Sequence, residues 1–126
     1  NSMAVSDYVL IPLEASAFSA EGLNGLIEII KDVQGINDDL KILGLVFLMV
    51  SKRENLEDSF REGFSQIADS LFKSSIRRSV AVHRSQGSGK PLLEYDSNSI
   101  AALDFNDLTD EFLERIKNIE TSEEVI

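Results

Sequence analysis

The sequence predicts an α/β fold in which helices pack on a partial, doubly wound parallel sheet. Short runs of apolar and β-branched residues alternate along the chain with segments whose apolar residues recur at helical spacing. This strand–helix–strand–helix–strand order favours parallel strands, because the intervening helices serve as crossovers. The 126 residues are enough for one domain, and the apolar share of 43% is ordinary for a protein with a hydrophobic core.

The first strand is predicted over residues 8–13, a continuous apolar run of the kind that is buried on both faces of a sheet. Pro12 is expected to end its hydrogen-bond ladder, because proline has no N–H to donate. A helix follows, with Ser19 as its N-cap and Gly35 near its end. The apolar stripe of this helix comprises Leu23, Leu26, Ile27, Ile30 and Val33.

Residues 40–50 are the most hydrophobic segment and predict the second strand. Asn55 is expected to cap the next helix, and a short third strand is expected around residues 71–76. The buried face of this second helix is predicted to comprise Leu56, Phe60, Phe64, Ile67 and Leu71.

Basic and small residues at 77–91 predict a connecting loop, and a long closing helix is expected from Ser99. Residues 121–126 are expected to form a frayed acidic tail, which leaves residues 1–120 as the folded part. A three-stranded sheet has open edges, so we expect the chain to self-associate. The stripe of the closing helix is predicted to be Ala101, Phe105, Leu108, Phe112 and Ile116, with its phenylalanines in the core.

Composition excludes several classes of protein. The chain has no cysteine, so it forms no disulfide and no thiolate metal site. No apolar run approaches the roughly 20 residues of a membrane span, and no secretory signal is recognisable, so we expect a cytoplasmic protein without membrane contact. The net charge is −10, yet residues 52–90 carry eight basic and five acidic residues. Such a segment is typical of an anion-facing surface or of ordinary solvated loops.

The tetrapeptide Gly-Ser-Gly-Lys at 87–90 invites comparison with a phosphate-binding P-loop. A P-loop requires a glycine where this chain has Arg84, and a Ser or Thr where it has Pro91. The segment is therefore not a P-loop. His83 is the only histidine and has no partner at metal-ligand spacing, so we interpret it as a surface residue.

Four stretches resemble a known family: AEGL at 20–23, LKILGLVFLMVSKREN at 40–55, LFKSSIRRSV at 71–80 and GKPLLEYD at 89–96. They are similar to the carboxy-terminal half of ParA/MinD-type deviant Walker ATPases, the ParA-like proteins of plasmid and chromosome partition. The resemblance covers nearly the whole chain and implies a P-loop NTPase-like fold. Two departures stand out: Arg77 replaces a proline, and residues 84–86 replace a Glu-Ala-Pro stretch.

The resemblance implies that the intact protein uses ATP and Mg²⁺. It also implies that Ser51 and the residues Ile76, Arg77 and Arg78 flank the adenine, since they follow strands at the sheet edge where ligands bind. The deviant Walker A loop of the family is not recognisable in this chain, so we expect the chain alone not to hydrolyse ATP.

The resemblance further implies nucleotide-dependent dimerisation, non-specific DNA binding and a ParB-like partner that stimulates hydrolysis. The residues expected to contact DNA phosphates are Lys52, Arg53, Arg78, Arg84 and Lys90. The alternative interpretation is a non-catalytic α/β module that works only through protein contacts.

Overall fold

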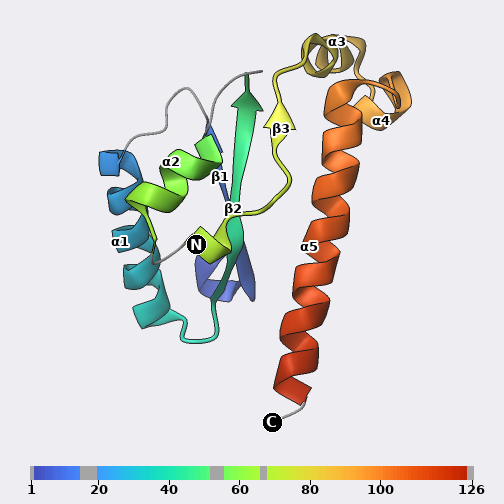
Figure 1. Cartoon of the computed structure of the whole chain (residues 1–126). Helices are drawn as coiled ribbons and strands as arrows, with labels where there is room; N and C mark the ends of the chain where they lie inside the picture. The colour runs from blue at the N-terminus through green and yellow to red at the C-terminus, as the bar shows by residue number, and fades with distance from the viewer. Residues whose placement is uncertain (1, 15–19, 52–55, 66–67, 125–126) are drawn as a thin grey trace.

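The computed structural model describes residues 2–14, 20–51, 56–65 and 68–124 (Figure 1). Its sheet has three parallel strands in the order β1-β2-β3. The strands are β1 (Tyr8–Glu14), β2 (Lys41–Val50) and β3 (Ile76–Arg77). The α-helices are α1 (Ala20–Ile36), α2 (Leu56–Gly63), α3 (Val80–Ser88), α4 (Leu92–Tyr95) and α5 (Ile100–Glu124); the 3-10 turns are η1 (Ser2–Val5) and η3 (Ala68–Ser70).

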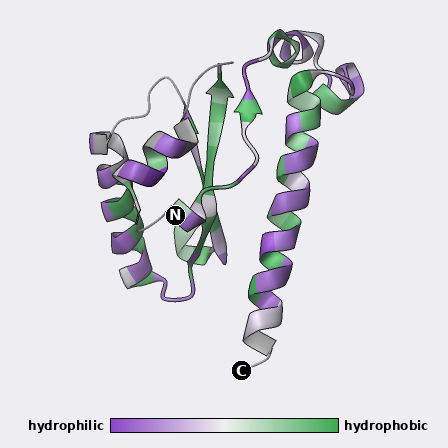
Figure 2. Cartoon of the chain, in the orientation of Figure 1, coloured by the Kyte–Doolittle hydropathy of each residue, from purple (hydrophilic) through white to green (hydrophobic). Residues whose placement is uncertain are grey.

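The elements form three layers, as the sequence predicts. Helices α1 and α2 lie on one face of the sheet, and the long helix α5 runs along the other face (Figure 1). Strand β2 is the most uniformly hydrophobic element, whereas hydrophilic and hydrophobic residues alternate along α1 and α5 (Figure 2). A partial parallel sheet with helices on both faces confirms the predicted fold class.

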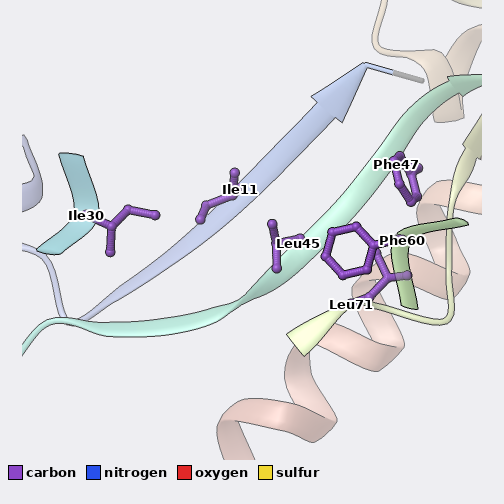
Figure 3. Packing of buried hydrophobic residues seen from close by; sticks show 6 residues of the cluster. All are labelled: Ile11, Ile30, Leu45, Phe47, Phe60 and Leu71. Carbon is purple, nitrogen blue, oxygen red and sulfur yellow. The ribbon is translucent and has the colours of Figure 1, made fainter. Parts of the chain in front are cut away.

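Two hydrophobic clusters fill the space between these layers. Under α1 and α2, the buried residues are Ile11, Ile30, Leu45, Phe47, Phe60 and Leu71 (Figure 3). Phe60 is fully buried, and its ring meets the ring of Phe47 edge-on at a centroid distance of 6.0 Å. Under α5, the buried residues are Leu43, Val46 and Phe72, and α5 contributes Leu108, Phe112, Ile116 and Ile119.

A β-bulge at Leu43 sets which residues of β2 face which layer. Val9 of β1 pairs with Ile42, but the next residue, Leu10, pairs with Gly44, so Leu43 is left over. Leu43 therefore joins the α5 cluster, while Leu45 joins the opposite one. A Cβ at Gly44 would lie 2.5 Å from both the Phe72 ring and the Ser70 carbonyl, so only glycine fits at this contact.

Strand β1 differs from its prediction in two respects. Pro12 does not end the ladder, because pairing continues from Pro12 with Val46 as far as Glu14 with Leu48. β1 has a described neighbour on one side only, and proline is tolerated on an edge strand where its missing N–H leaves no ladder bond unmade. The expected burial on both faces is incomplete: Val9 and Leu13 pack against one cluster and Tyr8 and Leu10 against the other, but Ile11 is the only residue of β1 that is more than partly buried.

The predicted loop at 77–91 is mostly helical. Ser79 caps α3, its Oγ accepting a hydrogen bond from the Ala81 N–H, and Gly89 ends the helix in the left-handed conformation. The helix was missed because almost all of its residues are exposed, so no apolar stripe marks it; only Ala81 and Ser85 are buried. The Gly89-Lys90-Pro91 stretch is thus the end of one helix and the start of α4.

Three further boundaries differ from expectation. The second helix ends at Gly63 rather than reaching Leu71, which instead forms an isolated bridge with Leu45. Regular pairing of the third strand is confined to Ile76–Arg77. Helix α5 continues to Glu124, beyond the predicted start of the tail. The expected caps Ser19 and Asn55, and Ile67, lie outside the described residues.

Candidate functional site

A cavity of about 440 Å³ opens where β2 and β3 end. This is the carboxyl edge of the parallel sheet, where open α/β folds bind their ligands. Its lining is mainly apolar, and its polar groups come from the end of β3, from the turn after it and from α3. The lining residues are Leu48, Met49, Ile76, Arg77, Arg78, Ser79, Val80, Val82, His83, Gln86 and Phe105.

The chain takes an unusual conformation at this edge. Met49 has a φ of 54°, in the left-handed region that residues with a side chain rarely adopt, and it is the only non-glycine residue of the described chain with a positive φ. The register between β2 and β3 shifts at the same point, so that Leu48 pairs with Ile76 and Val50 with Arg77. Strained backbone of this kind is concentrated at functional sites.

Arg77 is held by a buried carboxylate of α5. Its Nε and Nη2 donate to Asp104 Oδ2 and Oδ1 at 3.0 and 2.8 Å, and its backbone N–H donates to Oδ2 at 2.9 Å. The Asp104 side chain is 9% exposed, whereas that of Arg77 is 49% exposed. The pair thus fixes the end of β3 to helix α5 while half of the arginine remains accessible.

The electrostatics of this pair are mutually reinforcing. The hydrogen bonds to Asp104 raise the pKa of Arg77 above its ordinary value. Burial acts to raise the pKa of Asp104, but the hydrogen bonds from Arg77 outweigh burial and hold that pKa below its ordinary value. Asp104 is therefore ionised at neutral pH, and a charge pair lies at the cavity.

A second carboxylate and arginine fix α5 to the sheet from below the cavity. Glu111 accepts hydrogen bonds from the backbone N–H groups of Lys73 and Ser74, at 2.9 and 2.8 Å. Arg115 donates to Glu111 and to the carbonyl oxygens of Leu43, Ser70 and Leu71, at 2.9–3.2 Å. Its guanidinium also lies 4.0 Å from the centroid of the Phe72 ring.

The structure brings together three of the four residues predicted to flank a base. Ile76, Arg77 and Arg78 line the cavity, and the Arg78 N–H donates to the Val50 carbonyl at 3.1 Å, so the turn is tied to the end of β2. Ser51 follows β2 and is exposed, but it does not line the cavity. Whether any of these residues contacts a ligand stays a prediction.

The described residues predicted to contact DNA do not share one hollow. Arg78 lines the cavity, whereas Arg84 lines an adjoining open hollow of about 500 Å³, together with Tyr95 and Asp96. Lys90 is exposed just after the Gly89 cap. Lys52 and Arg53 lie outside the described residues.

Sequence reasoning missed Asp104 and misplaced Phe105. Phe105 is 40% exposed and lines the cavity instead of the core. The sequence contained a signal for Asp104. It lies three residues after Ala101 and four before Leu108, so a carboxylate occupies a position on the apolar stripe of the closing helix. His83 was interpreted as a surface residue; it is exposed, and it also lines the cavity.

These features define a class of protein. A partial parallel sheet covered by helices on both faces, with a cavity at the carboxyl ends of its strands, has the architecture of part of a P-loop NTPase-like fold. The family described as "AAA domain" matches residues 1–42 of the chain, which include β1 and α1.

Comparison with known proteins narrows this class. The chain is 31% identical over 117 residues to the chromosome-partitioning ATPase Soj of Treponema pallidum, covering 91% of the chain and 46% of the relative. It is 33% identical over 113 residues to the sporulation initiation inhibitor protein Soj of Bacillus subtilis (88% and 45%). It is 34% identical over 98 residues to the chromosome partitioning protein ParA of Caulobacter vibrioides (76% and 37%).

These matches confirm the predicted resemblance: over most of its length the chain is similar to ParA/MinD-type ATPases of the Soj and ParA group. The chain spans less than half the length of each of these relatives. In the described residues, no helix is both long enough and apolar enough to cross a membrane.

Proposed function

We propose that residues 1–120 are the carboxy-terminal half of a ParA-like partition ATPase domain and supply the site for the nucleotide base. The observation that carries this proposal is the cavity of about 440 Å³ at the ends of β2 and β3, together with its strained residue Met49. The similarity to proteins named Soj and ParA supports it, because those proteins are named as a chromosome-partitioning ATPase and a chromosome partitioning protein.

The cavity suits the flat, largely apolar ring of a base. Ile76 is buried at its floor, while Val80 and Phe105 are 66% and 40% exposed, as expected for walls that a ligand would cover. The polar side chains of Arg77, Arg78, Ser79, His83 and Gln86 also line it and could fix the orientation of a ring.

The phosphates and Mg²⁺ of ATP place different demands on a protein. Among the described residues, no group of three or more His, Asp or Glu side chains is placed to hold a metal ion. Bound Mg²⁺ neutralises charge on the transferred phosphoryl group, and in this family the groups that position it belong to the deviant Walker motifs. The described residues therefore fit the base and not the metal, and we expect no ATP turnover by this chain alone.

Partition also requires contact with DNA and with partners. We infer that Arg78, Arg84 and Lys90, with Lys52 and Arg53, bind DNA phosphates when the intact protein dimerises, since two copies of one weak basic surface act together. Arg78 and Arg84 are exposed, and within the described chain neither side chain forms an ion pair with an acid. A ParB-like stimulating partner and a cytoplasmic location complete the proposal.

Adenosine binding tests the base site directly. Phe105 and Leu113 are both exposed apolar residues of α5, but only Phe105 lines the cavity. Phe105→Ala is expected to weaken adenosine binding several-fold in an NMR titration, because it removes one wall of the cavity. Leu113→Ala serves as the matched control and is expected to bind as the unsubstituted chain does. Equal affinities for the two variants would contradict the proposed site.

A further inference from the structure

Strand β3 is too short to be held in place by its own pairing. It has two residues, and its only strand neighbour in the described chain is β2, where Leu48 pairs with Ile76 and Val50 with Arg77. So short a ladder contributes few hydrogen bonds, and the position of β3 depends on contacts outside the sheet. This position matters because Ile76, Arg77 and the turn that follows them line the cavity.

Asp104 supplies such a contact from helix α5. Its carboxylate accepts the backbone N–H of Arg77 at 2.9 Å, and it accepts Nε and Nη2 of the same residue at 3.0 and 2.8 Å. The backbone N–H groups of a sheet normally donate to a neighbouring strand, so Asp104 takes the place of a strand at this point. One buried side chain thus restrains both the backbone and the side chain of Arg77.

A carboxylate is a costly residue at this position of α5. Asp104 lies on the apolar stripe between Ala101 and Leu108 and is buried, so its charge is largely removed from water. Replacing a buried ion pair with apolar residues is often neutral or stabilising, so the pair is weak evidence for a role in stability. What aspartate provides and leucine does not is a fixed direction for the three N–H groups that it accepts. This favours a role in positioning.

Asp104 also connects the segments that line the cavity. Phe105, the next residue of α5, lines it directly, whereas Asp104 itself does not; Arg77 ends β3. Met49 lies between the two residues of β2 that pair with β3, and its φ is 54°. Strained backbone persists only where surrounding contacts fix it, so the conformation of Met49 depends on the position of β3. The hydrogen bonds of Asp104 therefore set α5, β3 and the end of β2 relative to one another.

We propose that Asp104 is a positioning residue of the base site: it holds β3 and α5 at the separation that fits the adenine ring, without touching the ligand. The inference rests on the proposed function and adds a residue that acts on its affinity for the nucleotide. The backbone N–H of Arg77 is the group that is held, and its guanidinium balances the buried charge of the carboxylate. A cavity preset in this way loses less conformational entropy when the base binds.

Adenosine titration of the ¹³C,¹⁵N-labelled chain tests the inference with variants of α5. Asp104→Leu keeps the size of the side chain but accepts no hydrogen bond, and it is expected to raise the Kd for adenosine about tenfold. Asp104→Asn keeps an oxygen for the backbone N–H of Arg77 and is expected to recover most of this loss. Asp104→Ala, which removes the same acceptors without adding apolar bulk, serves where Asp104→Leu does not fold.

Glu111→Gln is the matched control on the same helix. Glu111 also accepts two backbone N–H groups and pairs with an arginine, but it does not line the cavity. This variant is expected to lower the unfolding midpoint and to leave the Kd for adenosine within about twofold. The amide signal of Arg77 and the Cα shift of Met49, which reports backbone conformation, are expected to change in Asp104→Leu and to stay in place in Glu111→Gln.

The outcomes separate the inference from the proposed function. An unchanged Kd in Asp104→Leu overturns the inference and leaves the base site intact. A Kd that rises as much in Glu111→Gln as in Asp104→Leu also overturns it, because binding would then follow stability alone. If the unsubstituted chain binds no adenosine, the base site itself is wrong and the inference falls with it.

Discussion

Helix α5 is attached to the sheet at two places, each through a carboxylate of the helix that pairs with an arginine. The two pairs differ in how exposed the arginine is. At Glu111 and Arg115, every observed contact of the pair is internal: backbone N–H groups, three carbonyl oxygens and the Phe72 ring. At Asp104 and Arg77, the carboxylate is the more buried of the two, at 9% exposed against 16% for Glu111, but the arginine is half exposed and lines a cavity.

The side-chain exposures express the difference. Arg115 is 23% exposed and Arg77 is 49% exposed, although each donates to a carboxylate of α5. Arg115 donates to the carbonyl oxygens of Leu43, at the bulge of β2, and of Ser70 and Leu71, which lie beside that strand. Both terminal nitrogens of Arg115 donate within the protein, so Arg115 stabilises the fold, whereas among the described residues the Arg77 side chain bonds only to Asp104 and keeps its other donors exposed.

The largest effect is expected from Arg115→Met, which keeps an apolar stem but removes the charge. The substitution leaves the Leu43, Ser70 and Leu71 carbonyls without this donor and Glu111 without its cation, so the free energy of unfolding is expected to fall by about 3 kcal/mol. Urea unfolding measures this change. Lys117→Met, an exposed lysine of the same helix, is the control, and a decrease of similar size there would contradict the comparison.

Gly44→Ala is expected to lower the free energy of unfolding by about 2 kcal/mol, because it disturbs the sheet where Glu111 and Arg115 attach α5. The new methyl group would overlap the Phe72 ring and the Ser70 carbonyl, and the carbonyl belongs to the backbone and cannot turn aside. Gly25→Ala is the counterpart: its Cβ meets nothing within 4 Å, and alanine in helix α1 is expected to raise stability by about 0.5–1 kcal/mol. Both changes are read from urea midpoints, and a neutral Gly44→Ala would show that the contact is looser than described.

At the upper, accessible end, basic side chains are expected to act on binding and not on stability. In the intact protein, replacing both Arg78 and Arg84 with alanine is expected to weaken duplex DNA binding of any sequence alike. The slope of log affinity against log salt should fall by roughly one unit for each DNA phosphate that the variant no longer neutralises. A salt series with the unsubstituted protein and the double variant measures this. Unchanged affinity and slope would show that the two arginines are ordinary surface charges.

The smallest effect is expected in acid. Burial favours protonation of Glu111 and Asp104, but hydrogen bonds from backbone and arginine hold the pKa of each below its ordinary value. Their contribution to stability is therefore complete above the ordinary pKa values of the two groups, and it is lost as pH falls through the lowered ones. Glu111→Gln is expected to flatten the dependence of stability on pH below the ordinary glutamate pKa, because the substituted side chain no longer titrates. If the unfolding midpoint of the Glu111→Gln chain falls with decreasing pH as steeply as that of the unsubstituted chain, Glu111 does not contribute to acid unfolding as described.

Sequence reasoning succeeded where hydrophobicity determines structure. Residues 40–50 predict β2 to within one residue, and the stripe ending at Val33 predicts α1, because burial demands both patterns. Helix α3 was missed because few of its side chains are buried, although Ser79 and Gly89 stand at its ends as capping residues. The prediction that Pro12 ends the ladder of β1 was wrong, because proline is tolerated on an edge strand. That β1 is an edge strand depends on the whole sheet and cannot be recognised from its own residues.

In the candidate site, too, some residues could be predicted from the sequence and others could not. Open α/β sheets bind ligands at the carboxyl ends of their strands, and this rule predicted the sheet edge at which the cavity opens. Ile76, Arg77 and Arg78 line the cavity there. Met49 carries no sequence signal of a left-handed conformation, because only glycine and asparagine indicate it reliably. The Arg77–Asp104 pair joins residues 27 positions apart, and only the packing of α5 reveals it.

Chemical-shift mapping of a purine nucleoside on the ¹⁵N-labelled chain tests the central proposal most directly. Binding in the cavity between β2, β3 and α3 is expected to shift the amide signals of Met49, Arg77, Arg78 and Phe105. The signals around Gly44 and Arg115, at the closed attachment, are expected to stay in place. Shifts confined to the closed attachment or to α1, or no shifts at saturating nucleoside, would contradict a base site at this edge of the sheet.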